Sequence, residues 1–266
     1  MSKGLLIILA ASFLSFFALK TKKHFPPGTL QITETFFADE TEISNLSWLE
    51  YEYWTARKYG ALSAEHLAVM PDSNVWTEST HNDSHYGNIY YRGAKYRDYP
   101  VVGVSYEQCL AFCRWRTEMV KQFYAIRYRK ELVIEYRLPT MQEWEIISAS
   151  SMNATSTTGR DHKGRLLSNH FRRQDTSGIA AKNDMPDITA PVYSFWPNRL
   201  GLYNTVGNVA EMVAEKGICK GGSWHHQLEQ CRIGKKITYS KPAAWLGFRC
   251  VCDVKTPVNQ KRFKLF

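Results

Sequence analysis

The stretch YPVVGVSYEQCLAFCRWRTEMV, residues 99–120, contains both kinds of regular structure and decides the predicted fold class. Its first residues are apolar and rich in valine, which predicts a short buried strand. Ser105 is a good N-cap, because its hydroxyl can accept an amide hydrogen left free at the start of a helix. The residues that follow have an apolar inner stripe of Leu110, Phe112, Cys113 and Met119. A strand therefore passes directly into an amphipathic helix.

The regions on both sides contain further signals of the same kinds. Thr140 and Glu143 form a Thr-x-x-Glu capping box, which predicts another helix start. Upstream, apolar and polar residues alternate from Leu30 to Phe37, as in a half-buried strand. A helix is expected to start at an Asn45 cap and to end at Gly60.

Short strands are predicted again near the end of the chain, in the stretches ICKGGSW, QCRIGKKI and GFRCVC, which start at residues 218, 230 and 247. Residues 61–99 lack sustained periodicity but are rich in aromatic residues, so a long ordered loop is expected there. The region after Ser150 is also loop-like. Helices early and antiparallel strands late predict an α+β fold, loop-rich, with two to three helices and short antiparallel strands.

The composition is that of a globular protein and argues against a nucleic-acid partner. The 266 residues are 44% hydrophobic and 22% charged, with no linker or repeat that would divide them. The net charge is +9, but its basic residues are scattered apart from clusters near the two ends. A solvated basic face, or attraction to an anionic cell surface, accounts for this charge better than nucleic-acid binding.

The first residues resemble an export signal. Lys3 precedes an apolar run from Gly4 to Leu19, and three lysines follow this run closely. Residues 1–19 are therefore predicted to be a signal peptide, cleaved after Ala18, or an uncleaved N-terminal anchor. No cysteine precedes Cys109, so none lies near the signal to carry a lipid. The mature protein is expected to be soluble in an oxidising compartment or held there by a partner.

Five blocks of sequence carry a family resemblance: YPVVGVSYEQCLAFCRWR, YRLPTMQEWEII, APVYSFWPNRLGLYNTVGNVAEM, KGGSW and LGFRC. In this order they resemble the formylglycine-generating enzyme, or sulfatase-modifying-factor, family. The resemblance implies a variant of the C-type-lectin-like fold with bound calcium. It spans residues 28–254, which are taken as the domain, and leaves residues 255–266 as a basic tail.

The upstream stretches ADETEISNLSWLEYEYW and VMPDSNVW look similar to a particular branch of this family. That branch contains gliding-motility and type IX secretion lipoproteins of Bacteroidota, which lack the catalytic cysteine pair. It implies a protein of the periplasm or outer membrane that has envelope proteins as partners. Members of this branch are usually longer and lipidated, whereas no lipid anchor is expected on this shorter chain, which has no lipidation cysteine.

The stretch GGSWHHQLEQC, residues 221–231, departs from the catalytic pattern of the family. The enzymes hold Cu(I) between two thiolates five residues apart, a pair that falls here on His226 and Cys231. Ser223 persists, but alone it has no base within the motif. Where the enzymes carry Trp-Glu-Trp, this chain has Ala210, Glu211 and Met212.

This stretch has two interpretations, a surface strand end and a residual metal site. His225, His226 and Cys231 are too few ligands for a closed metal site, and on a strand the two histidines would point to opposite faces. The favoured interpretation is a surface histidine pair at a strand end, so copper is not expected. The alternative is a residual copper-dependent oxidase of protein cysteine or another oxidoreductase.

The six cysteines of an exported chain are expected to form disulfides, although 15 pairings are possible. Cys109 and Cys113 share one helical face, and Cys250 and Cys252 share one strand face. The family resemblance implies Cys113–Cys250. The spacing then favours Cys109–Cys252, and Cys219–Cys231 would remain.

Calcium is the ligand that the resemblance supports best. The first implied site consists of Asn204 and Glu211 side chains with Gly207 and Val209 carbonyls, a set of hard oxygen donors. Without a metal, this stretch would be a turn whose Asn and Gly adopt left-handed backbone positions. The second implied site consists of Asn169, the His170 carbonyl and Asp184.

The predicted function is a non-catalytic structural or binding module of the bacterial envelope, in gliding or type IX secretion machinery. Besides the oxidase, the fold and its aromatic loop also permit a lectin-like carbohydrate binder.

Overall fold

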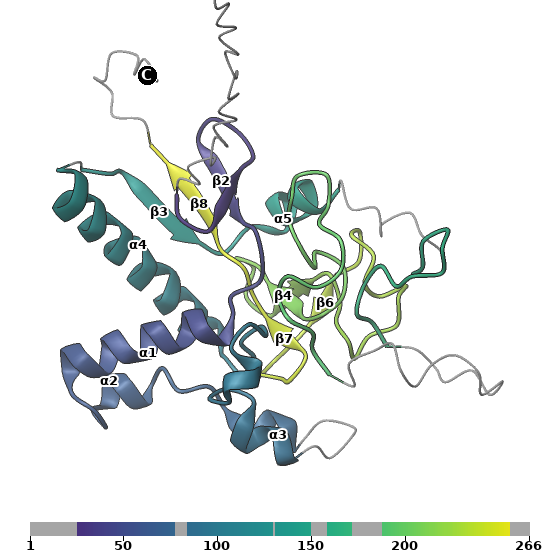
Figure 1. The fold of residues 1–266 in the computed structure, drawn as a ribbon, viewed down its shortest axis with the longest axis horizontal. Helices are drawn as coiled ribbons and strands as arrows, with labels where there is room; N and C mark the ends of the chain where they lie inside the picture. The colour runs from purple at the N-terminus through teal and green to yellow at the C-terminus, as the bar shows by residue number, and fades with distance from the viewer. Residues whose placement is uncertain (1–25, 78–83, 130, 150–158, 172–187, 256–266) are drawn as a thin grey trace, which may run out of the picture.

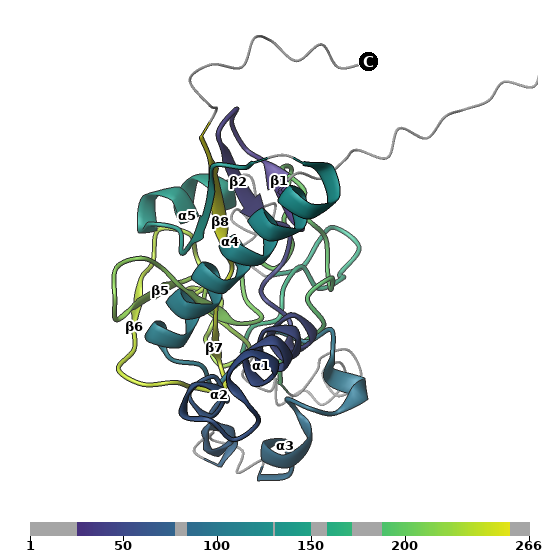
Figure 2. The same ribbon diagram turned by 90° about the vertical axis from the view of Figure 1, so that its left-hand side faces the viewer.

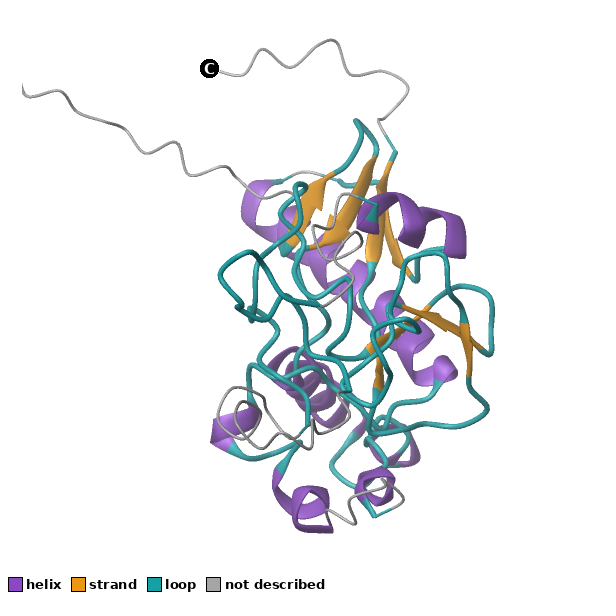
Figure 3. Ribbon diagram, turned by 90° about the vertical axis from the view of Figure 1, so that its right-hand side faces the viewer, coloured by secondary structure: helices purple, strands orange, loops and turns teal. Residues whose placement is uncertain are grey.

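The computed structural model describes residues 26–77, 84–129, 131–149, 159–171 and 188–255. Two small sheets and a set of helices are joined by long irregular segments, and Figure 3 shows that loops take up much of the chain. The longer helices are α1 (Asn45–Tyr59), α4 (Tyr106–Tyr128) and α5 (Met141–Ser148). This arrangement confirms the predicted α+β class.

The first sheet lies beside α4 at one end of the molecule (Figure 1). Its order is β1-β2-β8-β3, with every neighbouring pair antiparallel. The strands are β1 (Thr29–Gln31), β2 (Phe36–Asp39), β3 (Ile134–Arg137) and β8 (Val251–Val254). The alternating stretch from Leu30 to Phe37 is thus a hairpin rather than one strand, because the Thr33 hydroxyl accepts the Phe36 amide hydrogen at 3.1 Å and turns the chain.

The second sheet has the order β6-β5-β4-β7, in which β4 and β7 are parallel. Its strands have only two or three residues: β4 (Ala210–Met212), β5 (Ile218–Lys220), β6 (Ile237–Thr238) and β7 (Leu246–Gly247). The predicted strands at ICKGGSW and GFRCVC are confirmed in part. The predicted strand QCRIGKKI is wrong except at its last residue, because residues 230–234 form turns and only Ile237 belongs to β6.

Helix α4 begins as the sequence predicts. Ser105 and Gln108 form a reciprocal capping box, and Thr140 with Glu143 does the same for α5. The buried side of α4 consists of Cys109, Phe112, Cys113 and Thr117. The predicted stripe is therefore half correct, because Leu110 and Met119 are only partly buried. Figure 2 shows α4 crossing in front of the sheet strands β2 and β8.

Helix α1 ends at Gly60, where φ is positive, but its cap is Ser44 and not Asn45. Asn45 is fully buried and donates its amide hydrogens to the carbonyls of Tyr90 and Tyr96. It therefore ties α1 to the region predicted to be a long loop.

That region contains short helices: α2 (Ala64–Leu67), η1 (Ser73–Trp76), α3 (Ser84–Ile89) and η2 (Ala94–Tyr96). Its aromatic residues Trp76, Tyr90 and Tyr96 are buried together in a cluster with Val209 and Trp224, as their number suggested. Residues 101–104 are buried but form no strand, and only an isolated bridge joins Pro100 to Ser44. In the part of the chain that is described, no helix has the length and hydropathy needed to cross a membrane.

Candidate functional site

The stretch from Gly221 to Cys231 closes into a tight loop after β5. Gly221 and Gly222 have φ values of 84° and 65°, which glycine adopts without strain. A side chain at Gly222 would place its Cβ 2.3 Å from Cys231 Sγ and 2.7 Å from Cys231 Cα. Two glycines in succession therefore let the two ends of this loop touch.

His226 is buried inside this loop. Its Nδ1 is hydrogen-bonded to Ser223 Oγ at 2.6 Å, and its ring meets the Trp245 ring edge-on at 4.8 Å. Burial, with a smaller contribution from the neighbouring His225, lowers the pKa of His226 to about 4. The imidazole is therefore neutral at neutral pH. The predicted surface histidine pair is wrong for His226, because a turn and not a strand directs this side chain inward.

Cys231 is fully buried behind Gly222. Its sulfur contacts the backbone carbonyls of His226 and Ser223 at 3.8 and 4.0 Å. Burial raises the pKa of the Cys231 thiol to about 12, so the sulfur is protonated at neutral pH. A protonated thiol is neither a strong nucleophile nor a soft metal ligand. Among the described residues, no three His, Cys, Asp or Glu side chains are grouped to hold a metal ion.

The buried histidine predicts a specific pH dependence of stability. The folded pKa of His226, about 4, lies below its ordinary value of 6.5. Between these values the unfolded chain binds a proton that the folded chain does not, so stability should fall as pH is lowered through this window, by about 3 kcal/mol. Denaturant melts at several pH values would measure this loss.

In His226→Gln this part of the pH dependence should disappear. His162→Gln, on an exposed turn, is the matched control and should retain it. Equal slopes for all three chains would show that His226 is protonated in the folded protein as readily as in water.

A cleft of about 480 Å³ lies beside this loop. Trp224 and His225 line one side, and the segment between β6 and β7 lines the other, with Tyr239, Lys241 and Trp245. Trp224 is anchored by its indole N–H, which donates to the Ala244 carbonyl at 3.2 Å. Two tryptophans, a tyrosine and one lysine thus contribute to the cleft wall. Sequence reasoning missed the wall from Tyr239 to Trp245, because no periodic pattern marks it.

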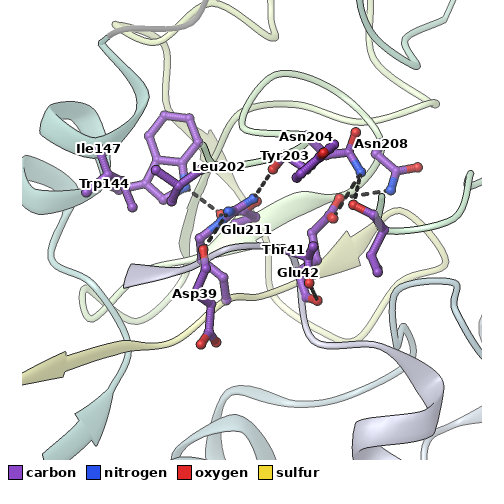
Figure 4. Close-up of polar contacts among 12 residues, drawn as sticks. Asp39, Thr41, Glu42, Trp144, Ile147, Leu202, Tyr203, Asn204, Asn208 and Glu211 are labelled. Atoms are coloured by element: carbon purple, nitrogen blue, oxygen red, sulfur yellow. Dashed lines mark hydrogen bonds and ion pairs between the residues drawn. The ribbon is translucent and has the colours of Figure 1, made fainter. Parts of the chain in front are cut away.

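The first implied calcium set is already engaged within the protein. Both Glu211 oxygens accept hydrogen bonds from Arg249, at 2.6 and 2.7 Å, and Oε2 also accepts the Trp144 indole hydrogen at 2.7 Å (Figure 4). The Asn204 amide donates to Glu42 and to the Val192 carbonyl. A calcium ion would have to displace a buried guanidinium from Glu211, so these residues do not fit calcium as they are arranged.

Glu42 forms the second half of this polar network. Its two oxygens accept hydrogen bonds from Asn208 at 2.8 Å and from Asn204 at 3.1 Å (Figure 4). Complete burial raises the pKa of Glu42 to about 8. In the ion-free protein this carboxyl is therefore mostly protonated at neutral pH.

The second implied set is only partly described. Asn169 and His170 are buried, and the Asn169 carbonyl accepts the Asn208 amide hydrogen at 2.7 Å. The Asn169 amide group donates to the Ile188 carbonyl at 2.8 Å. Asp184 lies outside the described residues, so calcium at this set stays a prediction.

Calcium can be tested by metal removal. If the second set binds the ion, adding calcium to chelator-treated protein should raise the melting midpoint, because a ligand that binds only the folded state stabilises it. A melting midpoint that stays the same at millimolar calcium would show that neither set of residues binds calcium. Magnesium serves as the control cation, because its octahedral preference suits a carbonyl-rich set poorly.

All six cysteines are buried free thiols in the structure, unlike the disulfides expected from the sequence. Cys113 and Cys250 are neighbours, with their sulfurs 3.5 Å apart, so the implied pair is brought together. Cys109 and Cys252, the second predicted pair, are not neighbours. Cys109 contacts Met212, whereas Cys252 lies opposite Tyr136, whose amide donates to Thr117.

The reason is the direction of α4 relative to β8. Helix and strand run the same way, so Cys252 is level with Thr117, one turn after Cys113, and Cys109 is one turn before it. The predicted Cys109–Cys252 bridge required the opposite direction. Cys219 and Cys231 are also apart: the Cys219 thiol faces the Ile237 carbonyl on β6, and Cys231 is enclosed by its own loop.

Thiol counting is a direct test of these contacts. In denatured, unreduced protein purified from an oxidising compartment, we expect four reactive thiols, because only Cys113 and Cys250 are placed to bridge. Six thiols would exclude this bridge. A count of zero reactive thiols would require disulfides between cysteines that the structure keeps apart, and would contradict the arrangement of α4 and β8.

Comparisons with known proteins identify the family to which the chain is similar. Residues 4–254 match the family model described as a sulfatase-modifying factor enzyme 1-like domain. The formylglycine-generating enzyme of Thermomonospora curvata is 28% identical over 194 residues, covering 59% of this chain and 56% of that protein. The inactive C-alpha-formylglycine-generating enzyme 2 of Bos taurus is 26% identical over 181 residues, covering 61% and 53%. The chain spans about half the length of the curated relatives it matches.

Two solved structures show the same fold. Treponema denticola variable protein 1 aligns with a TM-score of 0.51 at 19% identity, covering 82% of this chain and 84% of that one. The crystal structure of CarF aligns with a TM-score of 0.50 at 17% identity, covering 86% and 96%. With a family model that matches nearly its whole length, the chain belongs to the family of sulfatase-modifying factor enzyme 1-like domains.

Proposed function

We propose that this chain is a non-catalytic member of its family, which uses the fold to bind a partner. The observation that carries the proposal is the state of the two positions where the resemblance places the catalytic cysteine pair. One is a neutral buried histidine, His226, and the other is a buried, protonated thiol, Cys231. A linear copper(I) site needs two thiolates, and these positions offer at most one, because His226 has no sulfur. Matched relatives that are named inactive support the proposal.

The cleft beside this loop is the proposed binding place. Its aromatic wall suits an apolar or aromatic side chain, and Lys241 suits a carboxylate at the rim. A protein segment that presents both groups is therefore the proposed ligand. The resemblance of the stretch ADETEISNLSWLEYEYW supports envelope proteins of gliding or type IX secretion machinery as the source of that segment, in the periplasm or at the outer membrane.

Two experiments test the proposal. Incubation with copper(I), oxygen and a cysteine-containing peptide should leave the peptide thiol unoxidised. Formation of an aldehyde that is lost in Cys231→Ser would instead establish the oxidase.

For binding, affinity purification from native envelope should recover envelope proteins with the unmodified chain, and Lys241→Glu should lose them. Lys163→Glu, in an exposed turn away from the cleft, is the control and should retain them. Loss of binding in both variants would show a nonspecific charge effect. Recovery of glycans in place of proteins would favour the lectin-like alternative, since Trp245 and Tyr239 also present aromatic surface to a sugar.

A further inference from the structure

The last two turns of α4 project beyond the sheet that the helix covers (Figure 1). Nearly every side chain after Lys121 in this helix is exposed, including Phe123, Ile126 and Tyr128 with exposed fractions of 53%, 79% and 49%. Three aromatic rings, of Phe123, Tyr124 and Tyr128, pack against one another at centroid distances of 5.1 to 6.0 Å. The helix thus ends in an organised aromatic cluster with an exposed isoleucine beside it.

This helix end is also basic. Residues 121–131 contain four lysines and arginines and one acidic residue, Glu131. The Arg127 guanidinium lies 5.7 Å from the Tyr128 ring centroid, and Lys121 lies 3.5 Å from the carboxylate of Glu118. Even with Glu118 included, positive charge predominates around the exposed apolar side chains.

Both ends of the described chain come to the same region. The Pro27 carbonyl accepts hydrogen bonds from Arg116 of α4 and from the Tyr136 hydroxyl. At the other terminus, the Lys255 amide donates to Val133, and Lys255 shares a cleft with Lys121. The sequence before this region contains the apolar run 4–19 with its flanking lysines, and the sequence after it contains KRFKLF.

We propose that the end of α4 (residues 121–129) is a contact site for an anionic lipid bilayer. Aromatic and apolar side chains beside lysine and arginine are the composition that lies at the boundary between headgroups and acyl chains. Anionic headgroups complement the positive charge, and each basic residue near such a surface strengthens binding about fivefold. This inference does not depend on the proposed function, and it would hold equally for an enzyme.

The test uses the full chain and two labelling sites. Ile126→Cys, on α4, and Tyr53→Cys, on the exposed face of α1, each carry a nitroxide, while the native cysteines are buried. Both sites are exposed and next to aromatic residues, but only the first lies at the proposed contact. The chain is bound to vesicles of phosphatidylcholine with phosphatidylglycerol, and the label's accessibility to lipid-soluble oxygen and to an aqueous nickel chelate is measured.

We expect the Ile126 label to be oxygen-accessible and protected from nickel, and the Tyr53 label to remain in water. Pure phosphatidylcholine, or the pair Arg127→Gln with Arg129→Gln, should return the Ile126 label to water, whereas Arg57→Gln with Lys58→Gln on α1 should not. An Ile126 label that stays in water on bound chain overturns the proposal, as does lipid contact at both sites. Dipolar coupling between Ile126 labels without vesicles would show packing against a second copy, and would also overturn it.

Discussion

Replacing Arg249 with methionine is expected to destabilise the folded protein by about 3 to 5 kcal/mol. Arg249 and Glu211 have exposed side-chain fractions of 0% and 1%, and two hydrogen bonds join their side chains in an ion pair. The guanidinium also donates to the carbonyls of Asp39 and Tyr203, so it joins β2, β4 and the chain before the second sheet. Methionine replaces the apolar stem of arginine but has no guanidinium, so it would leave the Glu211 carboxylate buried without its counter-ion.

Two further variants separate this mechanism from a general loss of charge. Arg137→Met removes a half-exposed arginine that pairs with Glu143 and Asp253, and should cost only about 1 kcal/mol. The double variant Arg249→Met with Glu211→Gln should be more stable than Arg249→Met alone, because no buried charge is left unpaired and Gln still accepts the Trp144 indole hydrogen. Denaturant unfolding measures all three. A double variant less stable than the single one would mean that Glu211 is held by something other than Arg249.

The same ion pair explains why Glu211 is not free to bind calcium as the resemblance implies. From the sequence, Glu211 is a carboxylate among backbone carbonyls, which is what calcium prefers. Its actual counter-ion, Arg249, is 38 residues further on. Arg249 lies in the stretch GFRCVC, from which only a strand and two disulfide cysteines were predicted. Nothing in local sequence reports that β4 and β7 lie in parallel and bring these two residues together.

Signals that act within one turn of the chain predicted the structure well. The caps at Ser105 and Thr140 and the stop at Gly60 depend on hydrogen bonds between residues at most four apart, so the sequence contains the whole interaction. The aromatic residues of the segment 61–99 predicted its burial but not its short helices.

Predictions that needed the direction of one element against another were the ones that failed. Cys109 and Cys252 share faces with Cys113 and Cys250, as periodicity indicated, but the face alone does not say whether α4 and β8 run the same way. Likewise, a stretch as short as HHQLEQC contains too few residues to distinguish a strand from a turn by its pattern. The turn is what buries His226 and Cys231. The protonation states of these two side chains therefore depend on a turn that the sequence pattern did not predict.

Gly222→Ala should be nearly as damaging as loss of Arg249, with an expected cost of at least about 3 kcal/mol. Two effects add at this position. A Cβ at φ 65° costs about 1 kcal/mol of backbone strain. The same Cβ would also lie 2.7 Å from Cys231 Cα and 2.3 Å from its sulfur, so the backbone of the loop must move. Shortening the Cys231 side chain cannot relieve this clash, because Cα itself is in the way.

Two other glycines separate these effects in the same protein. Gly164 has φ 76° with nothing within 4 Å, so Gly164→Ala should show the strain alone, about 1 kcal/mol. Gly234 has open space and an ordinary φ, so Gly234→Ala should leave stability the same or raise it slightly. If Gly222→Ala costs no more than Gly164→Ala, the loop does not close on Cys231 as described. If the cost is large and the pH dependence assigned to His226 is lost as well, the glycine pair is what keeps His226 neutral and the cysteine a thiol.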